Sequence, residues 1–223
     1  MKELVQTPKT KIKRVSQRGS YDPDVIYKIL DQAFICHVGF IHEGNPVVIP
    51  TSYGRIGDNL YLHGSAKSRM LMTLGKGGEI CVTVTIVDGL VLARSIFHHS
   101  MNYRSVVLFG KPQKVTSEKE KEQALKAFTN HIIPGRWEEV RLPNKKELKG
   151  TTVVRLPIGE ASAKIRTGPP LDDQEDYKLP IWAGVIPIKA QPLDAIPDTK
   201  LSKDLTTTLS VTNYLAKFHH GQD

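Results

Sequence analysis

Residues 33–63 read AFICHVGFIHEGNPVVIPTSYGRIGDNLYLH, and this stretch decides the fold. It contains three apolar segments rich in β-forming residues, at 33–41, 46–53 and 60–63. They are separated by HEGN and GRIGDN, two short segments rich in turn-forming residues. Turns this short return each strand alongside the one before it. The stretch therefore predicts an antiparallel meander.

The flanking segments predict more strands than helices. Asp22 can cap a first helix that begins at Pro23, Ser65 can cap a short helix at 66–74, and a capping box at Ser117 starts a third helix. Further strands are predicted at residues 80–87, 90–97, 103–115, 151–158 and 160–166, with a turn at 88–89 between the first two. Helices do not alternate with strands, which argues against a doubly wound sheet. We expect a mainly β protein with peripheral helices, an antiparallel barrel or sandwich.

The composition is that of an ordinary globular protein with a basic balance. The 223 residues suit one domain, and 31 Lys and Arg against 23 Asp and Glu give a net charge of +8. This charge favours an anionic ligand, which leaves nucleic acid, anionic lipid and a phosphorylated small molecule open. No apolar run approaches the ~18–20 residues of a membrane span. Cys36 and Cys81 lie in apolar segments and give no disulfide framework, so we expect a cytoplasmic protein.

The chain divides into three parts by composition. Residues 1–20 are polar and basic and predict an exposed N-terminal arm, residues 21–190 form the domain, and residues 191–223 form a C-terminal extension without an assigned role. The last sixty or so residues are rich in loops, interrupted by a short apolar strand at 181–186. Trp182 lies in that strand, where a core role is expected more often than a cofactor contact.

One segment has the composition of a phosphate site. After Leu62-His63-Gly64 come two hydroxyls, Ser65 and Ser68, and two cations, Lys67 and Arg69, at the start of a predicted helix. Hydroxyls and backbone N–H groups donate to a phosphate, cations neutralise it, and a glycine lets the backbone approach closely. No nucleotide-binding glycine motif is present. The alternative is the end of a hairpin followed by a capped, solvated helix.

A second polar segment, residues 98–105, lies between two apolar strands. Arg104 and Ser105 could donate to an anion and Tyr103 could stack on a planar ring, or the segment is an ordinary polar turn. The adjacent His98 and His99 point to opposite faces of a strand, which disfavours a shared metal, and no metal site is expected.

In a third segment, Lys164 and Arg166 share a strand face, and the acidic run at 172–176 is expected to be a solvated loop that pairs with them. No catalytic motif accompanies these segments. Neither cysteine has polar, cationic neighbours that would lower its pKa, and motifs for a nucleophile elbow or a zinc protease are absent from the sequence. The chemistry is therefore expected to come from a bound organic cofactor.

The sequence resembles the FMN-binding split-barrel superfamily that includes pyridoxamine 5′-phosphate oxidase, and within it the branch that contains the nitroimidazole resistance proteins. The resemblance covers roughly residues 15–190. It is carried by the motifs RGSYD at 18–22, CHVGF at 36–40, PT at 50–51 with YGR at 53–55, YLHGS at 61–65 with KSR at 67–69, FHHSMNYRS at 97–105, PGRW at 134–137, and SAKIR at 162–166 with GPP at 168–170.

The resemblance implies a six-stranded antiparallel split barrel that forms a homodimer with two FMN sites across the subunit interface. Ser65 and Lys67 match the residues that hold the flavin phosphate, and the strand at 48–52 matches the one along the isoalloxazine edge. Arg104 and Ser105 match positions near the phosphate or ribityl chain, Trp182 matches a tryptophan that reaches the partner's flavin, and His63 is the candidate for a histidine near the ring.

The oxidase's cationic strand reads NPVVIPT at 45–51 here, and its C-terminal substrate motif is not recognisable, which argues against oxidation of pyridoxamine phosphate itself. We expect an FMN-dependent oxidoreductase with an unknown substrate. The alternatives are a non-enzymatic flavin or haem carrier or sensor, with His63 or His99 as a possible ligand, and, ranked last, a nucleic-acid-binding protein. Catalytic residues are not identified. The predicted cofactor-binding residues are Pro50, Thr51, Ser52, His63, Gly64, Ser65, Lys67, Ser68, Arg69, Tyr103, Arg104, Ser105 and Trp182.

Overall fold

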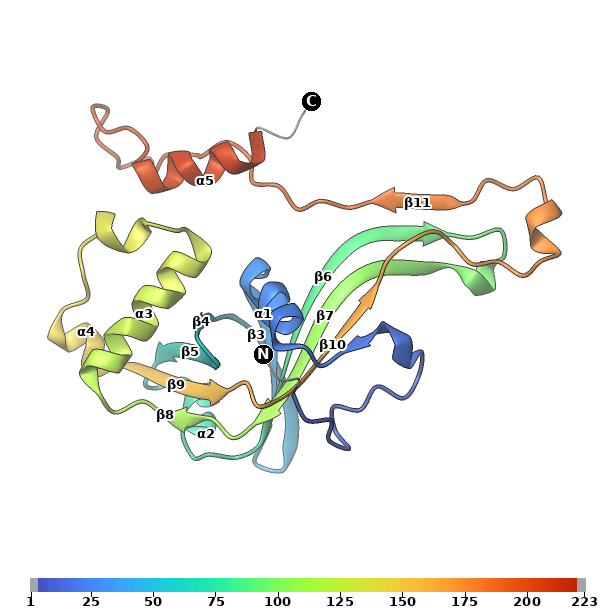
Figure 1. The fold of residues 1–223 in the computed structure, drawn as a ribbon. Coiled ribbons are helices and arrows are strands. Elements are labelled where there is room, and N and C mark those ends of the chain that lie inside the picture. The colour runs from blue at the N-terminus through green and yellow to red at the C-terminus, as the bar shows by residue number, and fades with distance from the viewer. Residues whose placement is uncertain (1–3, 220–223) are drawn as a thin grey trace.

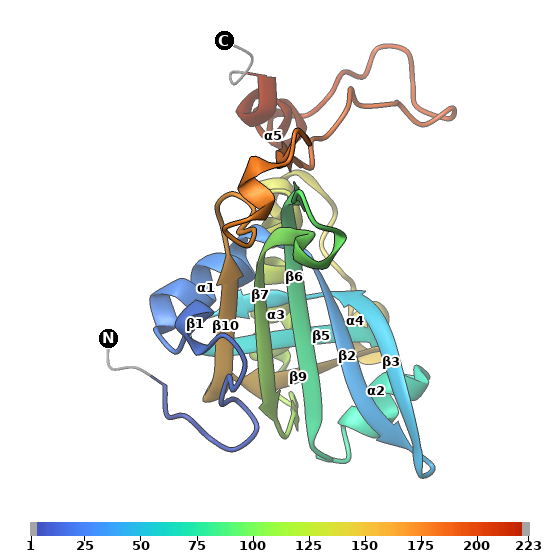
Figure 2. The ribbon, with the colours of Figure 1, turned by 90° about the vertical axis from the view of Figure 1, so that its right-hand side faces the viewer.

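Two antiparallel sheets form the body of the protein in a computed structural model that describes residues 4–219 (Figure 1). The larger sheet has the order β1 (Gly19–Ser20), β10 (Glu160–Arg166), β7 (Ser100–Gly110), β6 (Ile80–Leu92), β2 (Ile35–His42) and β3 (Asn45–Ser52), with β11 (Gly184–Pro187) added on β6. The smaller sheet has the order β4 (Gly54–Ile56), β5 (Asn59–Ser65), β9 (Thr151–Pro157) and β8 (Gln113–Lys114). Figure 2 shows the smaller sheet crossing behind the larger one.

The strand register divides the larger sheet into a core face and an outer face. One row of the outer face crosses β3, β2, β6, β7 and β10 through Pro50, His37, Thr83, Val107 and Ser162. Side chains alternate along a strand, so the residues between these positions point into the core. The core-facing set on these strands is fully or almost fully buried: Cys36, Val38, Val82, Val84, Val106, Leu108, Ala161 and Ala163.

The core lies between the two sheets and is closed by α1 (Pro23–Gln32). Asp22 caps this helix by accepting a hydrogen bond from the N–H of Asp24. Tyr53, at the corner between β3 and β4, is fully buried, and its hydroxyl lies 2.6 Å from the carbonyl oxygen of Leu30 and 2.8 Å from that of Ala33. These contacts tie the end of α1 to the corner between the sheets.

Three more helices lie around the smaller sheet. α3 (Glu118–Ile132), capped by Ser117, packs on β4, while α2 (Arg69–Leu74) and α4 (Lys145–Gly150) contact β9. The approach of α3 is close at Gly54, where a Cβ atom would lie 2.8 Å from the backbone nitrogen of Phe128. Glycine is therefore the residue that lets α3 pack against this strand.

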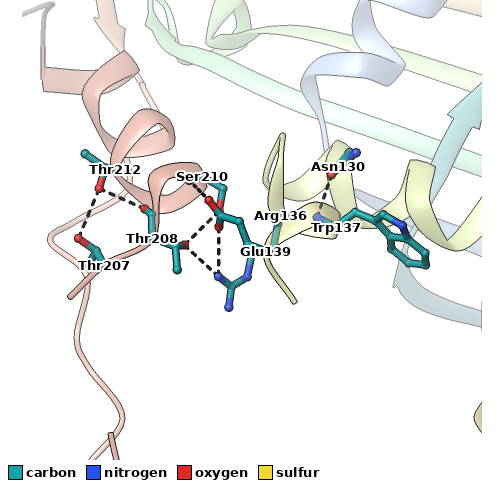
Figure 3. A network of polar contacts seen from close by, with 8 residues as sticks. All are labelled: Asn130, Arg136, Trp137, Glu139, Thr207, Thr208, Ser210 and Thr212. Carbon is teal, nitrogen blue, oxygen red and sulfur yellow. Dashed lines mark hydrogen bonds and ion pairs between the residues drawn. The ribbon is translucent and has the colours of Figure 1, made fainter. Parts of the chain in front are cut away.

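Strands β6 and β7 extend beyond the body as a long arm whose tip is a 3-10 helix at Ile96–His98 (Figure 1). The chain after β10 follows this arm, returns through β11 and crosses above the body to α5 (Leu209–His219). Figure 3 shows how α5 is anchored on the 3-10 helix Arg136–Glu139. The Glu139 carboxylate accepts from the N–H of Ser210 at 2.7 Å and from its hydroxyl, and Arg136 donates to Thr208 at 3.0 Å.

The mainly β class with peripheral helices is confirmed, and several local predictions were wrong. Asp88 and Gly89 were expected to form a turn, but β6 runs through them with a register shift, because glycine here serves a bulge. The helix predicted at 66–74 begins only at Arg69. The N-terminal arm is largely exposed, but it is tied to the body at Thr10, which is buried, because Tyr21 bonds to Thr10 and Ile12.

No helix among residues 4–219 has the length and apolar character needed to cross a membrane.

Candidate functional site

The segment predicted to bind a phosphate, residues 63–69, forms a tight loop at the end of β5. Its shape is held by backbone bonds: the N–H of Ser68 donates to the carbonyl of Ser65 at 2.9 Å, and that of Ala66 donates to Gly150 at 2.9 Å. The N–H of Lys67 donates to Ser65 Oγ at 3.2 Å. Ser68 is the N-cap residue of α2 but its side chain makes no cap bond, which leaves this hydroxyl available to a ligand. α2 has only six residues, so the hydroxyls and cations contribute more here than a helix dipole would.

The cations of this loop are not neutralised by the protein. Lys67 and Arg69 are exposed, and in the described part of the chain no carboxylate lies within ion-pair distance of either. Two unpaired cations next to two serine hydroxyls form a site that fits a phosphate. The grouping predicted from sequence at Ser65, Lys67, Ser68 and Arg69 is thus present as one exposed cluster.

Arg104 does not belong to this cluster. Its guanidinium makes a bidentate ion pair with Asp88, at 2.8 and 2.7 Å, and donates to Gln32. The bonds to Asp88 raise the pKa of Arg104 above its ordinary value, so Arg104 stays charged. The Asp88 carboxylate balances that positive charge. Arg104 shares the core-side parity of Val106, whereas Tyr103 and Ser105 point to the outer face. The structure therefore separates residues that the sequence analysis placed in one set.

The predicted ring-edge residues lie at the end of β3. This strand pairs on one side only, with β2, within the described residues, and its two prolines, Pro46 and Pro50, suit an edge strand because they cannot donate to a ladder. Pro50 and Ser52 point to the outer face, opposite His37 and Ile35 in β2. Thr51 has the opposite parity. A planar group along this edge would meet free backbone donors and acceptors.

His63 faces α3. Its ring packs edge-on against Phe128, with 4.1 Å between the ring centroids and an interplanar angle of 75°. Burial lowers the pKa of His63, so the ring is neutral at pH 7. Gly64 follows on the same strand, and a Cβ atom there would lie 3.2 Å from Leu71 Cδ1. The glycine thus lets α2 pack close to β5.

Trp182 and the histidine pair lie far from this loop along the arm. Trp182 precedes β11, which pairs with residues 89–92 of β6, and it is 67% exposed, so the expected core position was wrong. His98 Nε2 lies 3.3 Å from Asp173 Oδ2. Together with Asp176 these residues form a group of potential metal-binding side chains, whose ligand atoms all lie within 4.8 Å of one another.

The expected pairing of the acidic run with Lys164 and Arg166 was also wrong. Asp172 instead binds Arg94 at 3.1 Å and accepts from its backbone N–H. Lys164 donates to the carbonyl of Arg14, and Arg166 to Asn102. The acidic run thus fastens the C-terminal segment to the arm.

Two adjoining cavities, of about 710 and 470 Å³, were not predicted from the sequence. They are lined by residues at the junction of α1 with β2 and by residues of the C-terminal segment. Figure 1 shows this segment crossing above the body. The residues common to both are Gln32, Ala33, Phe34, Ala190 and Phe218. Their walls come from segments more than 180 residues apart, which no local sequence pattern would bring together.

Comparison with known proteins defines the class. A model of the family described as pyridoxamine 5′-phosphate oxidase matches residues 22–165. That is more than half of the chain, and its antiparallel sheets and peripheral helices are those of the split-barrel fold. The chain belongs to the pyridoxamine 5′-phosphate oxidase family.

Several solved structures are similar to this chain over most of its length. The flavocytochrome Anf3 from Azotobacter vinelandii is 42% identical, covers 95% of this chain and 97% of its own, and has a TM-score of 0.88. The FAD and haem binding protein from Mycobacterium smegmatis is 35% identical over 88% of this chain and 96% of its own, with a TM-score of 0.85. A putative 5-nitroimidazole antibiotic resistance protein from Bacteroides thetaiotaomicron is 26% identical over 66% of this chain and 86% of its own, with a TM-score of 0.54. None of the curated proteins matches the chain.

Proposed function

We propose that this protein is a flavin-binding redox protein that holds the phosphate of the flavin in the loop formed by Ser65, Lys67, Ser68 and Arg69. The observation that carries the proposal is the pair of exposed cations without a carboxylate partner in the described chain, next to two serine hydroxyls. The other candidate cation, Arg104, is already neutralised by Asp88. A phosphate bound by the loop places the rest of the flavin toward the edge of the barrel.

The isoalloxazine ring is proposed to lie along the end of β3, at Pro50, Thr51 and Ser52. Donors aimed at the ring edge stabilise the negative charge that develops there on reduction. A bound flavin supplies the electron transfer that the side chains lack, and the protein positions it and excludes water from it. His63, neutral and half-buried, is proposed to tune the ring's surroundings from the side of α3.

A second copy of the chain is proposed to cover the outer face of the larger sheet. Ile41 and Val48, on the β2–β3 hairpin of this face, are 59% and 65% exposed, an arrangement typical of a partner surface. A homodimer would enclose a flavin between two such faces, which a single shallow surface could not do. Trp182 is proposed to reach the partner's flavin, since it lies far from the loop of its own chain.

A haem group is proposed as a second cofactor. The flavocytochrome Anf3 and the FAD and haem binding protein match 95% and 88% of this chain, so both matches extend well past Ile165, where the family match ends. The proposed role is electron transfer between a flavin and a haem, and FMN-dependent oxidation of an unknown substrate is the other candidate. The relative from Mycobacterium smegmatis is an FAD and haem binding protein, so the loop is proposed to hold the phosphate of the FMN half, whichever of the two flavins is bound.

The test is flavin affinity in a matched pair of variants. The FMN and FAD affinities of the flavin-free protein are measured by quenching of flavin fluorescence for wild type, Lys67→Ala and the control Lys76→Ala, which removes an exposed lysine just after α2. Losing a charge-assisted bond to a phosphate is expected to weaken binding about tenfold to a hundredfold in Lys67→Ala alone. Equal affinities in all three proteins would refute the phosphate assignment.

A further inference from the structure

Three side chains that can bind a metal meet at the tip of the arm. His98 ends the 3-10 helix Ile96–His98 between β6 and β7, and Asp173 and Asp176 come from the segment after β10. Their ligand atoms, one imidazole nitrogen and two carboxylate oxygens, all lie within 4.8 Å of one another. Figure 1 shows the 3-10 helix Asp176–Lys178 beside the tip of the arm. Two segments that are distant in the sequence therefore supply this group.

The spacing of these atoms suits a single metal ion. Zinc binds imidazole nitrogen and carboxylate oxygen at about 2.0–2.2 Å, so neighbouring ligands of one ion lie roughly 2.8–3.6 Å apart. His98 Nε2 lies 3.3 Å from Asp173 Oδ2, which is within this range. The side chain of Asp173 is 82% exposed, so it is free to turn onto an ion that the other two side chains hold.

The two carboxylates have no lysine or arginine to balance their charge. Among residues 4–219, none lies within ion-pair distance of Asp173 or Asp176. The nearby Arg94 is bound by Asp172, which accepts from its guanidinium at 3.1 Å and from its backbone N–H at 2.9 Å. A protonated His98 would balance only one of the two carboxylates. The group therefore keeps a negative charge that attracts a cation.

The backbone holds the three side chains near one another without help from an ion. The N–H of Asp176 donates to the carbonyl of Asp173 at 3.0 Å, and the N–H of His98 donates to the carbonyl of Ser95 at 3.1 Å. The side chain of His98 is only 22% exposed, so most of its surface is already packed against the protein. Binding an ion here would therefore order few groups, and a small ordering cost favours affinity.

We propose that His98, Asp173 and Asp176 bind a divalent transition metal ion of the zinc type, which fastens the C-terminal segment to the tip of the arm. A mixed set of imidazole and carboxylate suits such ions, whereas Mg²⁺ and Ca²⁺ prefer oxygen ligands alone. Three protein ligands leave at least one position for water. His99 is not part of the site, because its Nδ1 lies 3.0 Å from the carbonyl of Ser95.

Zn²⁺ binding by full-length variants tests the site. His98→Gln and Asp176→Asn each remove one ligand. Their matched controls are His99→Gln, which removes the adjacent histidine, and Glu175→Gln, which removes an exposed carboxylate of the same segment that is not in the group. Zinc affinity is measured by isothermal titration calorimetry, and folding by circular dichroism. We expect about one ion per chain at this site and about a tenfold or greater loss of affinity in both ligand variants, because even losing a bond that supports a ligand costs about that much. Both controls should bind like wild type.

The outcomes that would overturn the site are separate from those that test flavin binding. Wild-type protein that binds no Zn²⁺, or equal affinity in His98→Gln and wild type, would refute it. Equal losses in Asp176→Asn and Glu175→Gln would show binding to diffuse negative charge instead of a defined site, and would refute it as well. If the ligand variants do not fold, modification of wild type by diethyl pyrocarbonate decides: Zn²⁺ should protect His98 but not His99 in fragment mass spectrometry, and equal modification of His98 with and without Zn²⁺ would refute the site.

Discussion

Replacing Gly54 by alanine tests how α3 is held against the barrel. The added Cβ atom would lie 2.8 Å from the backbone nitrogen of Phe128, 3.0 Å from its Cα and 3.2 Å from the carbonyl carbon of Ala127. All three are backbone atoms, so no side chain can turn aside to make room. The helix must move away from β4, and Phe128 would then lose its contact with His63.

The expected cost follows from that geometry. Overpacking that shifts a backbone costs about 1–3 kcal/mol, and for a chain of this size each kcal/mol lowers the melting temperature by roughly 2–4 °C. The free energy of unfolding of Gly54→Ala should therefore fall by about 1–3 kcal/mol in urea titrations, and its melting temperature should fall by roughly 2–12 °C.

Gly150→Ala is the matched control, because the same substitution should raise the free energy of unfolding there instead of lowering it. Gly150 ends α4, and a Cβ atom there meets nothing within 4 Å. Alanine at such a position stabilises by about 0.4–1 kcal/mol by reducing the freedom of the unfolded chain. If Gly54→Ala were as stable as wild type while Gly150→Ala behaved as expected, the close packing of α3 on β4 would be refuted.

Three further predictions concern single side chains. Bonds from the hydroxyls of Ser210 and Thr208 and the N–H of Ser210 lower the pKa of Glu139 to about 2 from its ordinary 4.5, so its contribution to docking of α5 is present above pH 4.5 and lost as the pH falls toward 2. The hydrogen-exchange protection factors of α5, which correct for the intrinsic pH dependence of exchange, should fall over that range in wild type and be independent of pH there in Glu139→Gln. Tyr53→Phe leaves the buried carbonyl of Leu30 without its hydroxyl partner, while the carbonyl of Ala33 keeps its contact with His131 Nε2. The substitution should cost about 1–3 kcal/mol in urea unfolding, and an unchanged midpoint would contradict this. Burial raises the pKa of the Cys36 thiol to about 12, so it should resist iodoacetamide at pH 8 in the native state and react on unfolding; rapid native labelling would disprove its burial.

The strands could be predicted because their signals are local. Alternation at 80–87 and the turn formers between residues 41 and 60 both act over a few neighbours, and the structure has these strands. The same local view misread Asp88-Gly89, since a turn and a β-bulge use the same residues and only the pairing of β6 with β7 distinguishes them. Trp182 was misplaced because a short apolar run does not show whether it has a sheet to pack against.

In the candidate site, too, local groupings could be predicted from the sequence and tertiary contacts could not. Ser65, Lys67, Ser68 and Arg69 are contiguous, so their grouping in one loop could be read from the sequence. The placement of Arg104 with Ser105 could have been questioned, because adjacent strand residues point to opposite faces. The partner that neutralises Arg104 lies on β6 and could not have been predicted. The cavities depend on the path of the C-terminal segment back across the body, which is a tertiary feature.

The most direct measurement of flavin binding by this chain is the visible spectrum of the purified protein, with mass spectrometry of whatever it releases on denaturation. We predict flavin absorbance bands, a released compound with the mass of FMN or FAD, and about one flavin per chain after reconstitution. Colourless protein that binds neither nucleotide when either is added in excess would contradict the account.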